Sequence, residues 1–236
     1  MRLSNKVIKY ESAIKISPDF IVPAKTYLPQ WYKNDTRLAK DQKRFQDKNI
    51  KHCVPFLDAL TTGYHIVTAQ DFIVIQDEGK PRLEWQTYVD PAYAIDHFMP
   101  IKTRPPEIAM TLPILPGFDD THFVWCTKGA IELPAGYSAI FTHPLNHYDL
   151  PFFSLSGVID NFTMPGGNFP FFLRSDFEGL IPKGTPILQI IPFKRENWES
   201  KEVLGLAHIG ELNNRVSAST FRGWYKNNHW KQKKYN

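Results

Sequence analysis

Cysteine is almost absent from this chain of 236 residues, because only Cys53 and Cys126 occur and they form no CxxC pair. Two isolated cysteines build neither a disulfide framework nor a zinc site, which excludes disulfide-stabilised secreted folds and zinc-binding modules. His52 stands beside Cys53, but the cysteine precedes an apolar run. We therefore expect a buried structural cysteine there rather than a nucleophile, in a protein of a reducing compartment.

Long apolar runs are also lacking. No stretch approaches the roughly 18 apolar residues that a membrane-spanning helix needs. The N-terminus has no apolar core of the kind found in secretory signal peptides. We expect a soluble protein that is not secreted and has no membrane partner.

Acidic residues are missing from the end of the chain. None follows Glu211, and the rest of the chain carries a formal charge of −2 once the six later basic residues are removed from the total of +4. Basic residues alternate with aromatic ones, which suits stacking on bases and pairing with phosphates in a nucleic acid. The alternative, which we favour, is a tail whose aromatic rings dock on the body or on a neighbouring subunit while the lysines stay in water. The candidate contact residues are Arg222, Trp224, Tyr225, Lys226, Trp230 and Lys231.

Proline and aromatic residues are abundant, with 19 prolines, 17 phenylalanines and 10 tyrosines. Prolines interrupt nearly every apolar run, which favours short strands and loops over a helical bundle. We predict a mainly β protein forming a single compact domain over residues 1–236. Its predicted parts are an extended arm and short helix (1–49), strands with a proline-rich excursion (50–122), a central core (123–195) and a C-terminal extension (196–236).

Local patterns place several of these elements. Alternating apolar residues predict strands over 63–69, 71–76 and 82–88, and Glu78-Gly79 between the last two is a hairpin signal. A polar segment at 35–49, which begins with Asp35 and Thr36 as possible caps, predicts the short helix of the first part.

Two motifs in the predicted core carry a family resemblance. GVID at 157–160 is followed, after 22 intervening positions, by KGTPILQI at 183–190, and LPAGY stands upstream at 133–137. These motifs and their spacing resemble those of the dUTPase and dCTP deaminase superfamily, whose fold is a β-clip. The resemblance covers about residues 124–193. It implies a dUTPase-like β-clip or distorted β-barrel core between the extended N-terminal arm and the basic, aromatic C-terminal tail.

The same motifs depart from the family where its chemistry resides. Thr163 replaces the base-stacking tyrosine, no Arg-Ser pair occurs within 142–146, and the Asp and Arg of the family's KGDRIAQ motif are missing. A single carboxylate cannot hydrolyse a phosphate ester without a metal and a phosphate cradle. The resemblance therefore implies a non-catalytic protein with a binding or assembly role, self-associating as a trimer as is usual in the family.

A second reading keeps the family's activity. It makes the chain a pyrimidine nucleotide-binding or nucleotide-hydrolysing enzyme that uses Mg²⁺, with Asp160 as the catalytic candidate. The nucleotide-binding candidates that the resemblance implies are Gln189, Gly184 and Asn146. Both readings expect Asp160 and Gln189 to lie on neighbouring strands.

A third reading comes from an HxD pair. His147 and Asp149, with His208 further along, follow the order in which Fe(II)- and 2-oxoglutarate-dependent oxygenases hold their iron. HxD is a short pattern, and the alternative is a set of polar turn residues beside Pro144 and Pro151.

The whole chain also resembles a family of about this length found in tailed phages and some bacteria. The resemblance rests on PAKTYLPQWYKN (23–34), CVPFLDALTTGY (53–64) and the stretch 168–198. It implies a phage-encoded protein in the host cytoplasm or the virion, with itself or other phage proteins as partners, and adds no mechanism.

Overall fold

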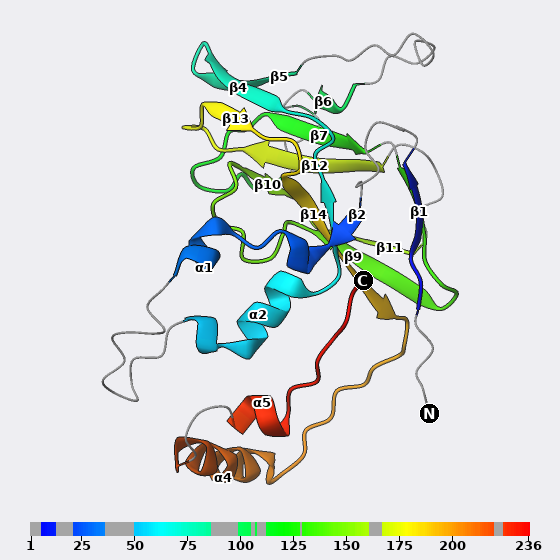
Figure 1. The fold of residues 1–236 in the computed structure, drawn as a ribbon, viewed down its shortest axis with the longest axis vertical. Helices are drawn as coiled ribbons and strands as arrows, with labels where there is room; N and C mark the ends of the chain where they lie inside the picture. Colours follow the sequence, from blue (N-terminus) through cyan, green and yellow to red (C-terminus); the bar gives the residue numbers. More distant parts are fainter. Residues whose placement is uncertain are drawn as a thin grey trace.

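The computed structural model describes residues 6–12, 21–35, 50–85, 99–104, 107, 112–127, 129–160, 167–219 and 224–236. Strands predominate among these residues and form four antiparallel sheets (Figure 1). The predicted mainly β class is thereby confirmed. The helix predicted over 35–49 lies, apart from Asp35, outside the described residues.

A five-stranded sheet carries most of the motifs singled out in the sequence. Its strand order is β11-β9-β14-β3-β2, so β9 separates β11 from β14. The strands are β2 (Ile21–Pro23), β3 (Tyr64–Val67), β9 (Tyr137–Thr142), β11 (Gly157–Ile159) and β14 (Pro186–Lys194).

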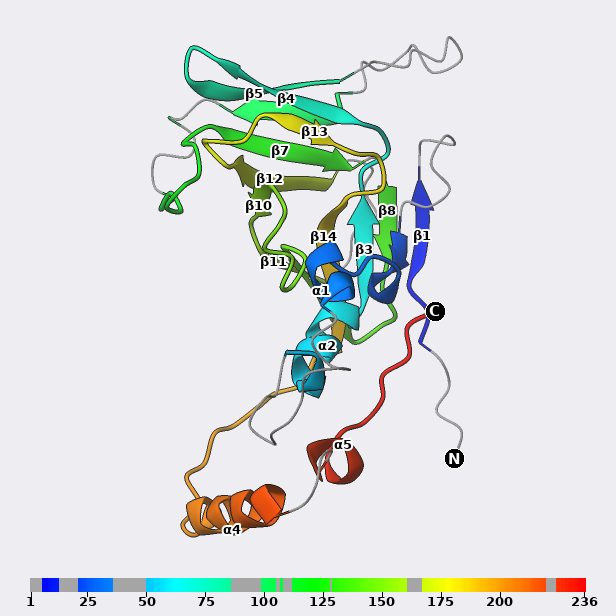
Figure 2. The same ribbon diagram turned by 60° about the vertical axis from the view of Figure 1, so that its left-hand side comes forward.

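The other sheets have two, three and four strands. Figure 2 shows β3, β8 and β1 running crosswise to β4, β7 and β12. The two-stranded sheet pairs β1 (Lys9–Ser12) with β8 (Gly129–Glu132). The three-stranded sheet has the order β13 (Gly179–Ile181), β4 (Phe72–Asp77), β5 (Lys80–Glu84). The four-stranded sheet has the order β10 (Phe152–Ser154), β12 (Gly167–Leu173), β7 (His122–Thr127), β6 (Ile101–Arg104). Strand β6 lies in the stretch that the sequence predicted as a proline-rich excursion.

Aromatic side chains fill the space between these sheets. Trp125 stacks on Phe171 at 3.9 Å between ring centroids, and both are buried. The indole N–H of Trp125 donates to Ser154 Oγ at 3.2 Å, and that hydroxyl donates to the carbonyl of Ile187 at 2.7 Å. Because Ile187 belongs to β14, this chain of hydrogen bonds ties the four-stranded sheet to the five-stranded one without leaving a buried polar atom unpaired.

The hairpin predicted around Glu78-Gly79 is confirmed. Strands β4 and β5 pair from Asp77 opposite Lys80, which leaves a two-residue loop. Both loop residues have positive φ, 51° for Glu78 and 78° for Gly79. A type I′ turn requires this, and it matches the twist of the strands that it joins.

Short helices lie between β2 and β3 in the chain. They are η1 (Ala24–Thr26), α1 (Gln30–Asn34), η2 (Ile50–His52) and α2 (Val54–Thr61). Helix α2 was not predicted; Pro55 in its first turn suits a helix start, where a backbone N–H has no partner to lose. Cys53 is the residue before this helix and is exposed, so the expectation of a buried cysteine there was wrong.

The turn between α2 and β3 brings two backbones together. Gly63 has a φ of +74°, and a Cβ added to it would lie 1.9 Å from the carbonyl oxygen of Ile190 on β14. Only glycine fits such a position. The close approach seats the end of α2 directly on the sheet.

After β14 the chain leaves the sheets. It runs to α4 (Leu206–Ser219) and α5 (Trp224–Asn228), which lie apart from the strands beyond α2 in both views (Figures 1 and 2). The last residues then return to the body. Among the described residues, no helix combines the length and apolar character needed to cross a membrane.

Candidate functional site

Gln189 is the centre of the polar contacts on the five-stranded sheet. It lies on β14 and is fully buried. Its Oε1 accepts the backbone N–H of Leu145 at 2.7 Å, and its Nε2 donates to the carbonyls of Ala59 at 2.9 Å and Thr62 at 2.6 Å. One side chain therefore joins the end of α2 and the loop after β9 to the sheet.

The loop after β9 is shaped by its own hydrogen bonds. The N–H of Ser154 donates to His143 Nδ1 at 3.4 Å, so Nε2 of that imidazole carries the proton and donates to the carbonyl of His147 at 3.2 Å. Asn146 has a φ of 62° and accepts the Tyr148 hydroxyl on its Oδ1 at 2.7 Å. Together with the bond from Gln189, these contacts hold the loop in one conformation.

This loop forms one side of a cleft of about 760 Å³. The remaining walls come from residues 116–118, the start of β10 and the turn at 174–176. Aromatic rings line it: His143 stacks on Phe153 at 4.9 Å, and Phe118 meets Phe153 edge-on at 6.3 Å. Clefts of this size with apolar walls and a few polar groups are typical of small-molecule sites.

The charges along the cleft cancel. Arg174 donates from Nε and Nη2 to the two carboxylate oxygens of Asp176 at 3.0 and 2.9 Å. The hydrogen bond from Arg174 lowers the pKa of the Asp176 carboxyl, so this pair stays ionised near neutral pH. Burial lowers the pKa of His143, which keeps that imidazole uncharged.

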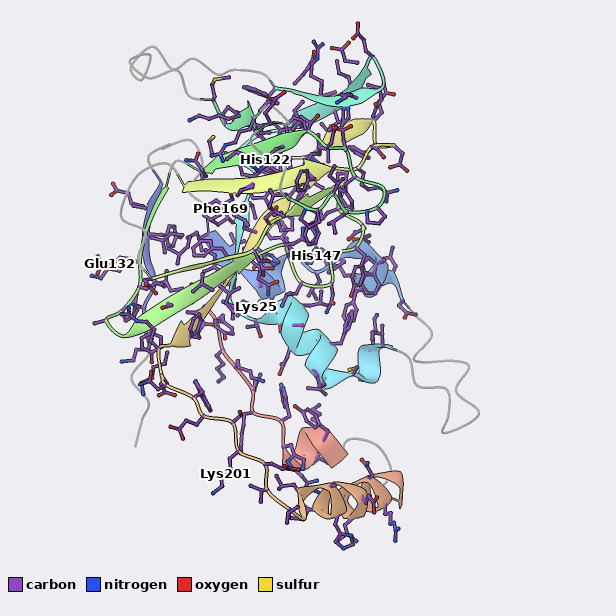
Figure 3. All side chains as sticks on the ribbon, turned by 180° about the vertical axis from the view of Figure 1, so that it is seen from behind. Lys25, His122, Glu132, His147, Phe169 and Lys201 are labelled. Atoms are coloured by element: carbon purple, nitrogen blue, oxygen red, sulfur yellow. The ribbon has the colours of Figure 1, made fainter. Side chains whose placement is uncertain are left out.

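A pair of buried histidines lies behind the loop. The rings of His65, on β3, and His147 meet edge-on with centroids 5.4 Å apart (His147 is labelled in Figure 3). Burial, reinforced by the neighbouring imidazole, lowers the pKa of His65 to about 3, and burial lowers the pKa of His147 to about 4. Both nitrogens of His65 and Nε2 of His147 are buried without a hydrogen-bond partner among the described residues. Both rings are therefore neutral at physiological pH.

Asp160 and Gln189 do not come together, contrary to the expectation that they lie on neighbouring strands. Asp160 follows β11 at the level of Ser138, whereas Gln189 pairs with Thr142 at the other end of β9. The Asp160 carboxylate is 69% exposed and accepts the Ser138 hydroxyl at 2.7 Å. Strand β9 stands between the two side chains, so the structure does not join them in one pocket.

The other nucleotide-binding candidates are also dispersed. Gly184 lies in the turn before β14 with a φ of +84°, where an added Cβ would approach the Tyr27 hydroxyl. Its N–H donates to the carbonyl of Thr68 at 2.9 Å. Asn146 lines the cleft instead. Of the residues taken from the family motifs, only Asn146 and Gln189 share a neighbourhood, through the loop that Gln189 holds.

The structure does not bring the proposed iron ligands together. His208 lies in α4 and is exposed, whereas His147 is buried beside His65 and Asp149 is exposed at the edge of the loop. The part of the chain that the structure describes holds no group of three His, Cys, Asp or Glu side chains able to bind a metal ion. His147 and Asp149 lie in the loop between Pro144 and Pro151.

The C-terminal tail docks on the body. Trp230 Nε1 donates to Asp58 Oδ2 at 2.9 Å, and Lys233 pairs with the same oxygen. Tyr235 meets Tyr64 edge-on at 5.8 Å. These contacts support the docking interpretation for Trp230. Of the other candidate contact residues, Lys226 and Lys231 are exposed and Tyr225 is 44% exposed. Trp224 begins α5, and Arg222 lies outside the described residues. Nucleic-acid contact through this segment stays a prediction.

We expect Asp58→Ala to release this tail. The substitution removes the shared acceptor of two donors. A hydrogen bond to a charged group contributes about 1.5–3 kcal/mol, and an exposed ion pair such as that of Lys233 about 0–1 kcal/mol. Hydrogen exchange at the amides of residues 230–236 should then become faster, while exchange in β14 stays slow. Glu199→Ala, an exposed carboxylate on the outgoing segment, is the control and should leave both unchanged. Equal protection in the Asp58 and Glu199 variants would contradict the docking.

Three residues of this region were not identified as site residues in the sequence. His65 was visible only as one residue of a predicted strand, at an inward position of the alternation. The sequence around Arg174 and Asp176 predicted only a polar turn, and no pattern in it indicated that this turn lies opposite residues 116–118 across a cleft. Sequence spacing carried no signal for these encounters, because each joins segments distant in the chain.

Comparison with solved structures gives a distant likeness. The dUTPase from phage phi11 of S. aureus matches 84% of this chain and 97% of its own, with 12% identity and a TM-score of 0.35. Two variants of the Staphylococcus bacteriophage 80alpha dUTPase, bound to dUpNHpp, match 84% of this chain and 88% of theirs, with 12% and 14% identity and TM-scores of 0.34. No protein-family model and no curated protein sequence matches the chain.

Proposed function

We propose that this chain is a non-catalytic, phage-encoded protein with a dUTPase-like β-clip core and a binding or assembly role. The observation that carries the proposal is the use of Gln189. Both hydrogens of its Nε2 bind main-chain carbonyls, and its Oε1 accepts a main-chain N–H. The glutamine retained from the family's KGDRIAQ motif therefore works inside the fold, out of reach of a ligand.

The position of Asp160 supports the same proposal. Its carboxylate is held by Ser138, with an Arg195 nitrogen 4.0 Å away. General-base or metal-assisted hydrolysis needs a carboxylate within hydrogen-bond reach of the reacting water and a cradle for the phosphates. In the part of the chain that the structure describes, the positive charge beside Asp160 is that of the exposed Arg195, and one cation does not make such a cradle.

An enzyme of the nucleotide-hydrolysing kind would be stabilised by its substrate. A ligand present at 100 times its Kd stabilises the folded state by about 2.7 kcal/mol, so substrate binding would raise the melting temperature measurably. Because we propose a non-catalytic protein, we expect no rise with dUTP, dCTP, dATP, dGTP or dTTP at millimolar concentration with Mg²⁺. Differential scanning fluorimetry measures this. A rise that increases with nucleotide concentration and is lost in Asp160→Asn would establish the enzyme reading instead.

For the assembly role we propose contact with a second copy of this chain through α4. This helix exposes Leu206, Ile209 and Leu212 to 60, 54 and 46%, at helical spacings that place them on one side. A helix of 14 residues is marginal in water on its own and is normally stabilised by packing. Glu211 and Arg215 balance each other's charge, so a second copy meets no net repulsion along α4.

We expect the chain to self-associate and the variant Leu206→Ser, Ile209→Ser, Leu212→Ser to be monomeric. Each copy would lose the apolar area that association covers. Light scattering coupled to size exclusion gives the mass. Ile73→Thr with Leu180→Thr, which changes two half-exposed apolar residues paired across β4 and β13, is the control and should keep the wild-type mass. A monomeric wild-type chain at about 100 μM would overturn the proposal, since assembly interfaces normally exceed that affinity.

A further inference from the structure

We propose that the cleft bounded by residues 116–118, the 143–148 loop and the 174–176 turn binds an uncharged, planar aromatic small molecule. This site is separate from the self-association through α4. Its walls, its charge and its fixed shape each bear on the chemistry of the occupant.

The walls present aromatic surface to the cleft. Phe118, His143 and Phe153 all line it, and each is only partly buried. Their mutual arrangement, stacked at 4.9 Å and edge-on at 6.3 Å, is the one in which a further ring is also accommodated at 4.5–7 Å. A flat ring is therefore the shape that covers the most of this surface.

The charges of the cleft wall decide against an ionic occupant. Arg174 and Asp176 are the oppositely charged residues of the cleft wall, and they are bound to each other by two hydrogen bonds. An anion attracted by the Arg174 guanidinium is repelled by the Asp176 carboxylate, and a cation attracted by the carboxylate is repelled by the guanidinium. A phosphate chain or a carboxylate would have to break this pair, whereas a neutral ring leaves it intact.

The cleft is also preformed. Gln189 holds the loop at Leu145, and His143 holds it at His147 and Ser154. Asn146 and Tyr148 also line the cleft and are hydrogen-bonded to each other, and their polar groups can bind a ring heteroatom. A site that needs no ordering on binding retains more of the contact energy as affinity.

The probes for the experiment are 5-fluoroindole, which is neutral, and two charged relatives, 5-fluoroindole-3-carboxylate and 5-fluorotryptamine. Fluorine NMR of each, titrated with the full chain, gives the dissociation constants. We expect about 1 mM or tighter for the neutral probe, as is usual for a fragment of this size, and at least about fivefold weaker binding of both ions.

Two variants test the walls and the charge separately. Phe153→Leu keeps apolar volume but removes the ring and should weaken 5-fluoroindole at least about fivefold, while Phe193→Leu, an aromatic residue on β14 outside the cleft, should not. Asp176→Asn leaves Arg174 uncompensated and should strengthen the carboxylate probe alone. Melting temperatures within a few degrees of wild type show that each variant is folded.

The outcomes separate cleanly. Saturable binding that falls only in Phe153→Leu supports the site. Absence of binding up to about 5 mM, or equal binding to the Phe153 and Phe193 variants, overturns it. Tighter binding of either ion to the wild-type chain overturns the assignment of a neutral ligand.

Discussion

Replacing Gln189 with leucine is expected to lower the free energy of unfolding by about 3–5 kcal/mol. The leucine fits the buried volume but leaves the N–H of Leu145 and the carbonyls of Ala59 and Thr62 without the partner they have now. Each buried polar group that loses its bond costs about 1–3 kcal/mol. Because these three groups belong to α2 and the loop after β9, both should loosen before the sheet does.

The measurement is chemical denaturation followed by tryptophan fluorescence. Gln189→Glu tests the reason for the loss, since a carboxylate still accepts from Leu145 but cannot donate to two carbonyls and would carry a buried charge. It should be at least as destabilising as the leucine. Thr142→Val, on the neighbouring strand, is the control and should cost under about 1 kcal/mol. A loss below about 1 kcal/mol in Gln189→Leu would show that the three bonds contribute little.

The second large effect is a loss of stability in mild acid. The pKa values of His65 and His147 are lowered to about 3 and about 4 from an ordinary 6.5. The unfolded chain therefore binds protons below pH 6.5 that the folded chain refuses. Stability from these groups is full above pH 6.5 and is lost as the pH falls toward the folded values, on the order of 3 kcal/mol per histidine by pH 4.

The slope of stability against pH isolates this contribution from that of the carboxylates. Denaturation midpoints of wild type and His65→Phe are compared between pH 7.5 and 4.5; the variant should lose clearly less stability over the interval, because one buried neutral imidazole is gone. The groups around the pair include Asp149, which raises the pKa of His147, and His143, which lowers it, so His147 alone is a less clean probe. His208→Gln, an exposed residue of α4, should reproduce the wild-type slope. Parallel slopes for His65→Phe and wild type would contradict a buried neutral histidine.

The strands were predictable where local chemistry is decisive. Alternation of apolar residues placed β3, β4 and β5, and Glu78-Gly79 fixed their hairpin, since both signals act between residues close in sequence. Helix α2 was not predicted, because its apolar run and Pro55 are compatible with either an edge strand or the start of a helix. Contact with the sheet, through Gly63 and Gln189, is what selects the helix there.

The candidate site was only partly predictable. The motif spacing singled out Gln189 and Asn146, and the structure does bring the Gln189 amide to the loop that holds Asn146. The motif spacing could not show that Asp160 lies across β9 from Gln189, because the spacing of motifs does not determine the order of strands in a sheet. Nor could it pair His147 with His65, a residue that no motif marked.

The sequence alone determined the class of the fold, through proline-punctuated runs of aromatic and β-branched residues that have no other stable arrangement than short paired strands. It also determined the charge asymmetry of the tail. Only the tertiary structure decided what the polar residues do: Asp58 anchors the tail, Gln189 braces a loop, and Arg174 neutralises Asp176 at a cleft. The reason is physical, since the role of a hydrogen-bonding or charged group is set by the partner that folding brings within about 3 Å of it, whatever its neighbours in sequence.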